Sequence, residues 1–361
     1  MNLEELRNDL SSVDRQLIEL IARRHGIVSA IGNCKRATGR ATRDYEREKD
    51  VLDLARSQAK ALNIDPKLAE EVVTALIRSS LASQERDRVA AEGKGDGRHV
   101  LIIGGAGKMG GWFVDFFNSQ GFATTIADID VEPGLGRFKE WRQAGIDYDV
   151  IVVATPLAVS GKILAELAEQ RPAGLIFDIG SLKSPLKSGL QALLNAGCMV
   201  ASLHPMFGPG TDLLSGRHLI FVDVGCDEAT TKAKELFSAT MVEVLDMGLD
   251  DHDRLIAYVL GLSHALNIAF FTALAESGEA APKLAKLSST TFDAQLLVSA
   301  VVARDNPRMY FEIQHLNKFG LDPLDALCES MRRIRDLVAA GDQDGFVDLM
   351  LKGREYLATR R

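Results

Sequence analysis

The sequence has no long apolar run and no secretion signal. No stretch reaches the roughly 18 apolar residues that a membrane helix needs. The N-terminus, MNLEELRNDL, is charged from its fourth residue, unlike a signal peptide. We therefore expect a cytoplasmic protein without a membrane partner.

Cysteine and positive charge are also scarce. The four cysteines among 361 residues are far apart and form no CxxC pair, so we expect neither a metal site nor a disulfide framework. The 42 Lys and Arg are outnumbered by 50 Asp and Glu, which gives a formal charge of -8 and argues against a nucleic-acid partner. An anionic ligand must therefore be met by local basic residues.

Residues 1–90 carry helical patterns and no strand signal. Leucines and a valine from Leu3 to Leu20 alternate steps of three and four, a narrow stripe typical of a long helix that packs against another helix. Further helices are predicted over about 43–62 and 66–84, the latter with Asp65 as N-cap before Pro66. This range predicts an all-α domain.

A polar, glycine-rich stretch follows at 91–97 and has the composition of a flexible linker. Beyond it, strands alternate with helices over 98–247, which predicts an α/β Rossmann-type domain. From 248 to 361 the strand signals stop, and RLIAYVLGLSHALNIAFFTALAE predicts a buried helix with few charges. An all-α C-terminal domain that dimerises is the natural way to bury it.

The motif Gly105-Ala106-Gly107-Lys108-Met109-Gly110 follows a predicted strand and opens a helix. Gly105 permits a tight turn, Gly107 lets a pyrophosphate approach the backbone, and Gly110 allows close helix packing. The second strand ends about twenty residues later in Asp128, whose carboxylate suits a ribose 2′-hydroxyl and repels a 2′-phosphate. The pattern predicts NAD as cofactor, with candidate contacts at Gly105, Gly107, Lys108, Met109, Gly110, Asp128, Thr155 and Pro156.

Three loops follow the later strands, where catalytic residues of such a sheet are expected. They are ATP at 154–156, GSLKS at 180–184 and HPMFGPG at 204–210. His204 is placed to accept a proton from a hydroxyl as hydride leaves a substrate. Ser181 and Lys183 are placed to orient an anionic substrate.

GGAGKMG, GSLKSPL, HPMFGPG and HDRLIAYVLGLSH together resemble the prephenate dehydrogenase family across about 98–350. Residues 1–90 resemble the chorismate mutase family, and the order of the two matches the bifunctional enzymes that join them. The resemblance implies a homodimer that converts chorismate to prephenate and then, with NAD, prephenate to 4-hydroxyphenylpyruvate in tyrosine biosynthesis.

The positions that match the mutase site are Arg7, Arg24, Lys35, Asp44, Arg47, Glu48, Ser80 and Gln84. By the resemblance, Arg7 and Arg24 clamp carboxylates, Lys35 and Gln84 meet the charge growing on an ether oxygen, and Glu48 takes the ring hydroxyl. At 100° per residue, Arg24 and Lys35 fall about 20° apart on one helix face and Arg7 about 100° away. Arg7 therefore suits a neighbouring site, and the resemblance implies that it reaches into the partner protomer's pocket.

For the dehydrogenase, the resemblance makes His204 the base, Ser181 its helper, and Lys183 and His264 substrate-binding residues. The family arginine expected six residues before Pro307 is Val301 here, and a second is replaced by Asp293. Arg304 or Arg308 can replace the missing cation, and we favour Arg304. His218 and His252 receive no role, although His252 is placed to begin a helix.

These departures leave alternatives open. The substrate is prephenate, arogenate, or the rearranged product of 4-amino-4-deoxychorismate, whose ammonium Asp293 suits. In another functional class, the C-terminal part only binds nucleotide and regulates the mutase.

Overall fold

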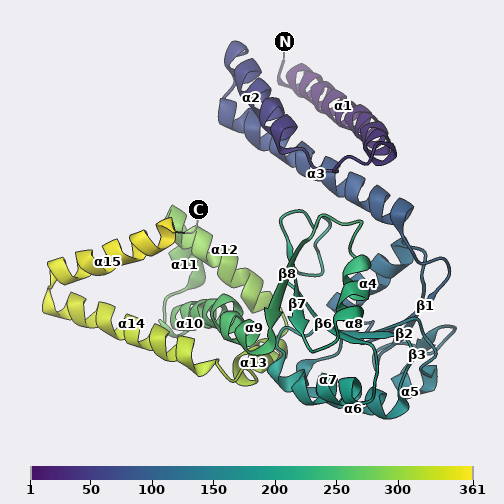
Figure 1. The fold of residues 1–361 in the computed structure, drawn as a ribbon. Coiled ribbons are helices and arrows are strands. Elements are labelled where there is room, and N and C mark those ends of the chain that lie inside the picture. Colours follow the sequence, from purple (N-terminus) through teal and green to yellow (C-terminus); the bar gives the residue numbers. More distant parts are fainter. Residues whose placement is uncertain (1, 360–361) are drawn as a thin grey trace. The chain divides into compact units, whose positions relative to one another are not determined.

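The structure is a computed structural model that describes residues 2–359. The chain divides into two compact units. Figure 1 shows the ribbon coloured along the sequence. The first contains residues up to Thr155, Lys162–Gly180 and Gly189–Met247, and the second contains Pro156–Gly161, Ser181–Ser188 and the chain from Gly248 onward. Residue 1 of the predicted range 1–90 and residues 360–361 of the range 248–361 lie outside the described residues.

Three helices open the first unit: α1 (Leu3–Ala37), α2 (Tyr45–Ala61) and α3 (Pro66–Glu92). α1 starts at a capping box in which the Asn2 side chain accepts from the Glu5 amide. The Asp65 side chain accepts from the Lys67 amide, which confirms the predicted cap of α3. α3 continues to Glu92, eight residues past the predicted end at Gln84, because the sequence after Gln84 contains no helix breaker before Gly93.

The glycine-rich stretch after α3 is packed rather than loose. The Gly95 amide donates to Gln120 O and the Gly97 amide to Gly121 O. A Cβ on Gly95 would lie 2.2 Å from the Gly121 carbonyl carbon, so only glycine fits there. The interpretation of 91–97 as a flexible linker is therefore wrong, because these glycines serve close backbone contact.

An eight-stranded sheet follows in the order β3-β2-β1-β4-β5-β6-β7-β8. Its strands are β1 (His99–Ile103), β2 (Ala123–Ala127), β3 (Arg137–Phe138), β4 (Val150–Val153), β5 (Leu175–Asp178), β6 (Val200–Pro205), β7 (His218–Asp223) and β8 (Glu243–Gly248). The strands from β3 across to β6 are parallel, and β7 runs antiparallel to β6. The parallel part and its reversal of strand order at β1 confirm the Rossmann-type prediction.

Helices cover both faces of this sheet (Figure 1). They are α4 (Lys108–Ser119), α5 (Trp141–Ala144), α6 (Leu157–Gln170), the 3₁₀ turn η1 (Ser184–Leu186), α7 (Lys187–Asn195) and α8 (Asp227–Glu235). On the face covered by α4 and α8, Phe113, Phe117 and Phe177 are fully buried. The fully apolar strands thus predict burial on both sides correctly.

The second unit holds the helices after residue 248. They are α9 (Leu249–Ile256), the π-helical turn η2 (Ala257–Leu262), α10 (Ser263–Glu276), α11 (Ala281–Lys286), α12 (Thr290–Arg304), α13 (Pro307–His315), α14 (Leu321–Ala340) and α15 (Gln343–Ala358). Buried Asn267 of α10 accepts from Gln295 and Ser299 of α12, each at 2.9 Å, and joins these two helices.

The helix formed by α9, η2 and α10 corrects one expectation. Over Leu249–Glu276 it is long and apolar enough to cross a membrane, with a mean hydropathy of 1.6 in its most apolar window. Scattered Ser, Asn and His residues interrupt the apolar sequence but leave its mean hydropathy high. The sequence therefore contains no uninterrupted run of 18 apolar residues, although the helix as a whole is apolar. Only 22% of that window is buried within the chain, so its burial requires another surface.

Candidate active sites

Seven of the eight side chains predicted for a mutase site line one cavity of about 520 Å³ formed by α1, α2 and α3. They are Arg24, Lys35, Asp44, Arg47, Glu48, Ser80 and Gln84. Apolar side chains, among them Ile27, Val51 and Leu81, form the remaining wall. A cavity with several cations and an apolar wall suits a compact dianion that carries a hydrocarbon ring.

Short contacts hold the polar groups of this cavity in place. The Arg24 guanidinium donates to Leu76 O at 3.0 Å and to the Ser80 hydroxyl, and Lys35 Nζ donates to Thr42 O at 2.7 Å. The Gln84 side chain packs on Gly32, where a Cβ would lie 3.2 Å from Gln84 Cγ. Gln84 Oε1 is buried and has no hydrogen-bond partner among the described residues.

Glu48 is held by Arg43, which the sequence prediction missed. The Arg43 Nε and Nη2 atoms donate to the two Glu48 carboxylate oxygens at 2.9 Å each. This hydrogen-bonded pair raises the pKa of Arg43 above its ordinary value, against desolvation. The fork holds Glu48 as a fixed acceptor on the cavity wall.

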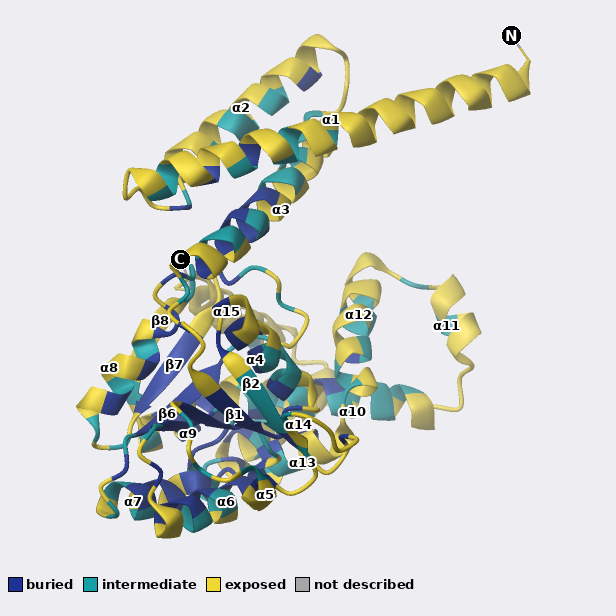
Figure 2. Cartoon of the chain, turned by 90° about the vertical axis from the view of Figure 1, so that its right-hand side faces the viewer, coloured by how far each residue is buried: buried dark blue, intermediate teal, exposed yellow. Residues whose placement is uncertain are grey.

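Arg7 does not line this cavity. It lies on the exposed N-terminal part of α1, whose apolar stripe is also exposed: Leu3 is 64% exposed, Leu10 61% and Leu20 59%. Figure 2 shows this part of α1 exposed along its length. A helix with an unburied apolar stripe requires a partner surface.

The predicted dinucleotide loop runs from β1 into α4. Gly104 has φ +90°, and a Cβ on Gly110 would lie 2.0 Å from Gly104 O. Gly107 is the N-cap of α4 and, as a glycine, provides no side chain to cap the first amides of the helix. Gly105 approaches Ile126 of β2, Met109 packs on the core, and Lys108 opens the helix.

Asp128 follows β2 and lies against this loop. Its Oδ2 accepts from the Ala106 amide at 3.0 Å, and its Oδ1 accepts from Asp130 at 3.0 Å. Thr155 follows β4, which pairs with β1, and Pro156 follows Thr155. A glycine loop, a helix N-terminus with no side-chain cap and a carboxylate after β2 fit an adenine dinucleotide.

His204 lies one residue before the end of β6 and is 5% exposed. Two residues earlier on the same face, the Ser202 hydroxyl donates to Asp178 of β5 at 2.6 Å. The chain beyond His204 is anchored to α4, since Trp112 Nε1 donates to Thr211 O at 3.2 Å. His204 is therefore a rigidly mounted strand-end histidine.

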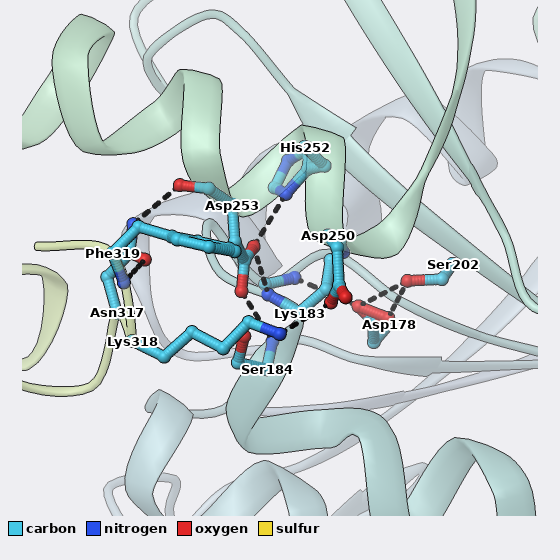
Figure 3. A network of polar contacts seen from close by, with 11 residues as sticks. Asp178, Lys183, Ser184, Ser202, Asp250, His252, Asp253, Asn317, Lys318 and Phe319 are labelled. Carbon is cyan, nitrogen blue, oxygen red and sulfur yellow. Dashed lines mark hydrogen bonds and ion pairs between the residues drawn. The ribbon is translucent and has the colours of Figure 1, made fainter.

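In the second unit, Ser181 and Lys183 precede η1, and Lys183 is fully buried. The Lys183 and Ser184 amides donate to the two Asp253 carboxylate oxygens at 2.9 and 2.6 Å. His252 Nδ1 lies 2.8 Å from Asp253 Oδ1, as Figure 3 shows. Burial opposes ionisation of Asp253, but these hydrogen bonds outweigh it and lower its pKa.

His264 and Arg304 lie on different helices of this unit. The His264 ring contacts the edge of Tyr310 at 4.4 Å between centroids, and burial lowers the His264 pKa. Arg304 is exposed at the end of α12, Val301 is 70% exposed, and Asp293 accepts from the Ser288 hydroxyl. Arg308 is also exposed, in the first turn of α13.

Comparison with known families gives three matches along the chain. Residues 6–85 match chorismate mutase type II. Residues 130–244 match the prephenate dehydrogenase nucleotide-binding domain, and residues 249–352 match the prephenate dehydrogenase dimerization domain. The chain belongs to the chorismate mutase/prephenate dehydrogenase family. The family match to the nucleotide-binding domain begins after the glycine loop, whose assignment therefore depends on its geometry.

Similar proteins have the same domain order. The chain is 27% identical over 349 residues to the T-protein of Enterobacter agglomerans, covering 96% of this chain and 90% of that protein. It is 24% identical to the T-protein of Haemophilus influenzae, over 98% of this chain and 92% of that protein.

Among solved structures, the prephenate dehydrogenase of A. aeolicus in complex with hydroxyphenyl propionate and NAD+ has a TM-score of 0.57 at 20% identity. That match covers 73% of this chain and 98% of the solved one. At this identity the likeness shows the fold of the family's dehydrogenase part.

Sequence reasoning missed two further features of this family member. His252 does not begin a helix: α9 starts at Leu249, and His252 is fully buried beside Asp253. The π-helical turn η2 directly precedes the helix of His264, a distortion that often marks functional sites. The HD pair of HDRLIAYV was a local signal for the His252–Asp253 contact, whereas the π-helical turn has none.

Proposed function

We propose that this chain is a bifunctional enzyme of tyrosine biosynthesis, a chorismate mutase and an NAD-dependent prephenate dehydrogenase. The observation that carries the proposal is the cavity in which seven predicted mutase side chains meet, followed in the same chain by a dinucleotide cradle. Both family matches support the pairing of these activities.

The mutase reaction breaks the ether C–O bond of chorismate and forms a C–C bond to give prephenate. It needs no nucleophile, so the protein contributes by selecting the compact conformer and stabilising charge. Arg24, with Arg47 lining the same cavity, holds a carboxylate of chorismate. Lys35 and Gln84 donate hydrogen bonds to the ether oxygen as it gains negative charge. Glu48 accepts from the ring hydroxyl, and Arg43 keeps it in place.

For the dehydrogenase reaction, we propose that His204 accepts the proton of the prephenate C4 hydroxyl. Ser181 polarises that hydroxyl, and Lys183, His264 and Arg304 bind the substrate. The C4 hydride leaves to the acceptor, the ring carboxylate departs as CO₂, and its electron pair completes the aromatic ring. The phenolate oxygen then takes back the proton from His204 to give 4-hydroxyphenylpyruvate. Aromatisation drives the step, so positioning and exclusion of water are the protein's main tasks.

NAD supplies the hydride acceptor when bound. We propose that Gly105, Gly107 and Gly110 form its pyrophosphate cradle with Lys108 and Met109, that Asp128 accepts from its ribose hydroxyls, and that Thr155 and Pro156 border it. The 2.0 Å approach of a Gly110 Cβ to Gly104 O supports this proposal, because a side chain there would force α4 away from the glycine loop.

We further propose a homodimer that works in the cytoplasm. The exposed stripe of α1 and the exposed Leu297 and Val301 of α12, 73% and 70% exposed, support two dimer contacts, one in each part of the chain. The matched dimerization domain supports the second contact. In such a dimer Arg7 completes the partner's mutase site.

The test is an assay of purified protein with chorismate and NAD. We expect prephenate to form without nucleotide, and reduced nucleotide to appear when NAD is present. Absence of prephenate contradicts the mutase. Absence of reduced nucleotide from every candidate substrate supports the alternative of a C-terminal module that only binds nucleotide.

One observation makes an alternative dehydrogenase substrate worth testing. Two arginines expected from the family resemblance are replaced here by Asp293 and by the exposed Val301. A relative at 28% identity over 272 residues is the 4-amino-4-deoxyprephenate dehydrogenase of Streptomyces pristinaespiralis. Comparing prephenate, arogenate and 4-amino-4-deoxyprephenate by kcat/KM, with NAD and NADP in turn, separates these substrates. Prephenate with NAD is expected to give the highest value.

A further inference from the structure

The segment between β6 and β7, residues 206–217, contacts the mutase helices. It starts directly after Pro205, the last residue of β6 and the neighbour of His204, and ends where β7 begins. Trp112 of α4 holds its middle through Thr211 O, and the ring of Trp112 lies 5.0 Å from the ring of Phe207. We name residues 206–217 the β6–β7 segment.

The first contact reaches the mutase cavity through Arg43. Its Nη1 donates to Ser215 Oγ of the β6–β7 segment at 2.8 Å, while its other two donors hold Glu48. The Arg43 and Glu48 side chains are 29% and 18% exposed, so both are partly shielded from water. One rigid guanidinium therefore links Ser215 to the carboxylate on the cavity wall.

The second contact is made by Glu85, the residue after Gln84 on α3. Glu85 is 4% exposed, and its carboxylate accepts from the Leu214 amide at 2.7 Å and from the Met241 amide. Burial raises the pKa of Glu85, and the two amides oppose that rise. A buried carboxylate with these partners fixes α3 at the position of Gln84.

We infer that Arg43 is a positioning residue for the mutase reaction and that Ser215 and Glu85 make the β6–β7 segment part of the mutase site's support. The inference rests on the proposed mutase function. It assigns to the dehydrogenase part a second task, which is to help hold Glu48 and Gln84 in place on the wall of the mutase cavity.

The physical reason is the precision that this reaction needs. Glu48 and Gln84 act only by position, and a functional group displaced by about half an ångström loses much of its effect. Arg43 alone holds Glu48 on a flexible side chain, and Ser215 removes part of that freedom. The β6–β7 segment, which starts two residues after the proposed dehydrogenase base His204, therefore also supports the mutase site.

The test uses full-length variants assayed separately for both reactions. Arg43→Ala is expected to lower mutase kcat/KM about 30-fold and Ser215→Ala about fivefold, since a hydrogen bond to a charged group is lost in each. Arg43→Lys is expected to remain impaired, because lysine has no fork for two carboxylate oxygens. Arg40→Ala, an exposed neighbour, and Ser238→Ala, whose hydroxyl bonds only locally, are the matched controls.

A double variant distinguishes positioning from general damage. If Ser215 acts through Arg43, adding Ser215→Ala to Arg43→Ala leaves mutase kcat/KM unchanged within twofold. Full multiplication of the two effects overturns the inference, as does equal loss of the dehydrogenase reaction with supplied prephenate.

Glu85→Gln gives a readout that needs no activity. In the full chain we expect faster amide hydrogen exchange at Leu214 and Met241, with Glu92→Gln as the control on the exposed end of α3. Unchanged exchange at both amides overturns this contact. A wild-type chain without mutase activity refutes the proposed function, and the exchange data still decide whether the contact exists.

Discussion

The mutase cavity and the dehydrogenase residues are built in opposite ways. Every side chain that lines the cavity comes from the first three helices and the turns between them, and all lie within one unit. The proposed dehydrogenase residues extend from Gly105 to Arg304, and they are divided between two units. One site follows helix periodicity, whereas the other follows sheet topology.

The way each site is built explains why the mutase cavity has the basic residues expected from the resemblance, whereas the second unit lacks some of them. The mutase cavity retains all the basic residues expected within one protomer, held by local contacts such as Lys35 to Thr42 O. The second unit has lost an expected arginine at Val301, on a helix that is mostly exposed. Side chains that share one small cavity constrain each other, while a residue on an exposed helix can be replaced by a neighbour one turn away.

The largest effect is expected from chains that separate the contributions of two protomers. Arg7→Ala and Lys35→Ala are each expected to lower mutase activity by about 100-fold or more, because each removes a charge placed at the reacting groups. Mixed and reassembled, the two chains are expected to regain about a quarter of wild-type activity, since one site of each heterodimer is intact.

The control is the dehydrogenase rate, which should stay constant in every mixture. Verified heterodimers without regained mutase activity would show that Arg7 acts within its own chain. The mutase site would then be complete within one chain and one unit, whereas the proposed dehydrogenase residues are divided between two units.

His204→Asn provides the converse test. It is expected to lower the dehydrogenase kcat by about 100-fold, the usual contribution of a positioned base, and to leave the mutase within twofold. Stopped-flow measurement of reduced nucleotide and a separate chorismate assay check both. An unchanged dehydrogenase rate would remove His204 from the mechanism.

The sequence predicts the parts of these sites that are local in the chain and misses the contacts between residues far apart in it. Helix spacing predicts that Arg24 and Lys35 share a face, and the structure confirms it in one cavity. The glycine motif and Asp128 are predictable because they are local to one β-α-β unit. Arg43 with Ser215 and Glu85 with Leu214 are separated by more than a hundred residues, so no local pattern indicates them.

Composition also misleads where a residue serves packing. Gly95 belongs to a stretch with linker composition, yet it is glycine because Gly121 approaches it closely. The exposed leucines of α1 have the opposite problem, since their pattern predicts burial that a single chain does not provide. Both cases depend on neighbours that the sequence alone does not place.

A smaller effect is expected at Asp253, which holds the loop of Lys183 rather than contacting substrate. Asp253→Asn keeps one acceptor and loses the second, so the Lys183 or Ser184 amide loses its partner. We expect about a tenfold fall in dehydrogenase kcat/KM, mainly through KM for prephenate, with the mutase unchanged. Equal losses in both reactions would indicate general destabilisation instead.

The smallest effect concerns the pH dependence of stability in the second unit. Burial lowers the pKa of His264, so below about pH 6.5 the unfolded chain binds a proton that the folded chain resists. Stability therefore falls as pH drops from about 6.5 toward the lowered folded pKa, and it is constant above.

Between pH 7.5 and 5.5 we expect wild type to lose about 1 °C more in Tm than His264→Asn, because the site is only partly buried. Scanning calorimetry checks this, with His218→Asn as the control because His218 opens β7 in the first unit, away from His264 in the sequence and in another unit. If His264→Asn loses as much Tm as wild type on acidification, burial does not lower the pKa of this histidine enough to affect stability.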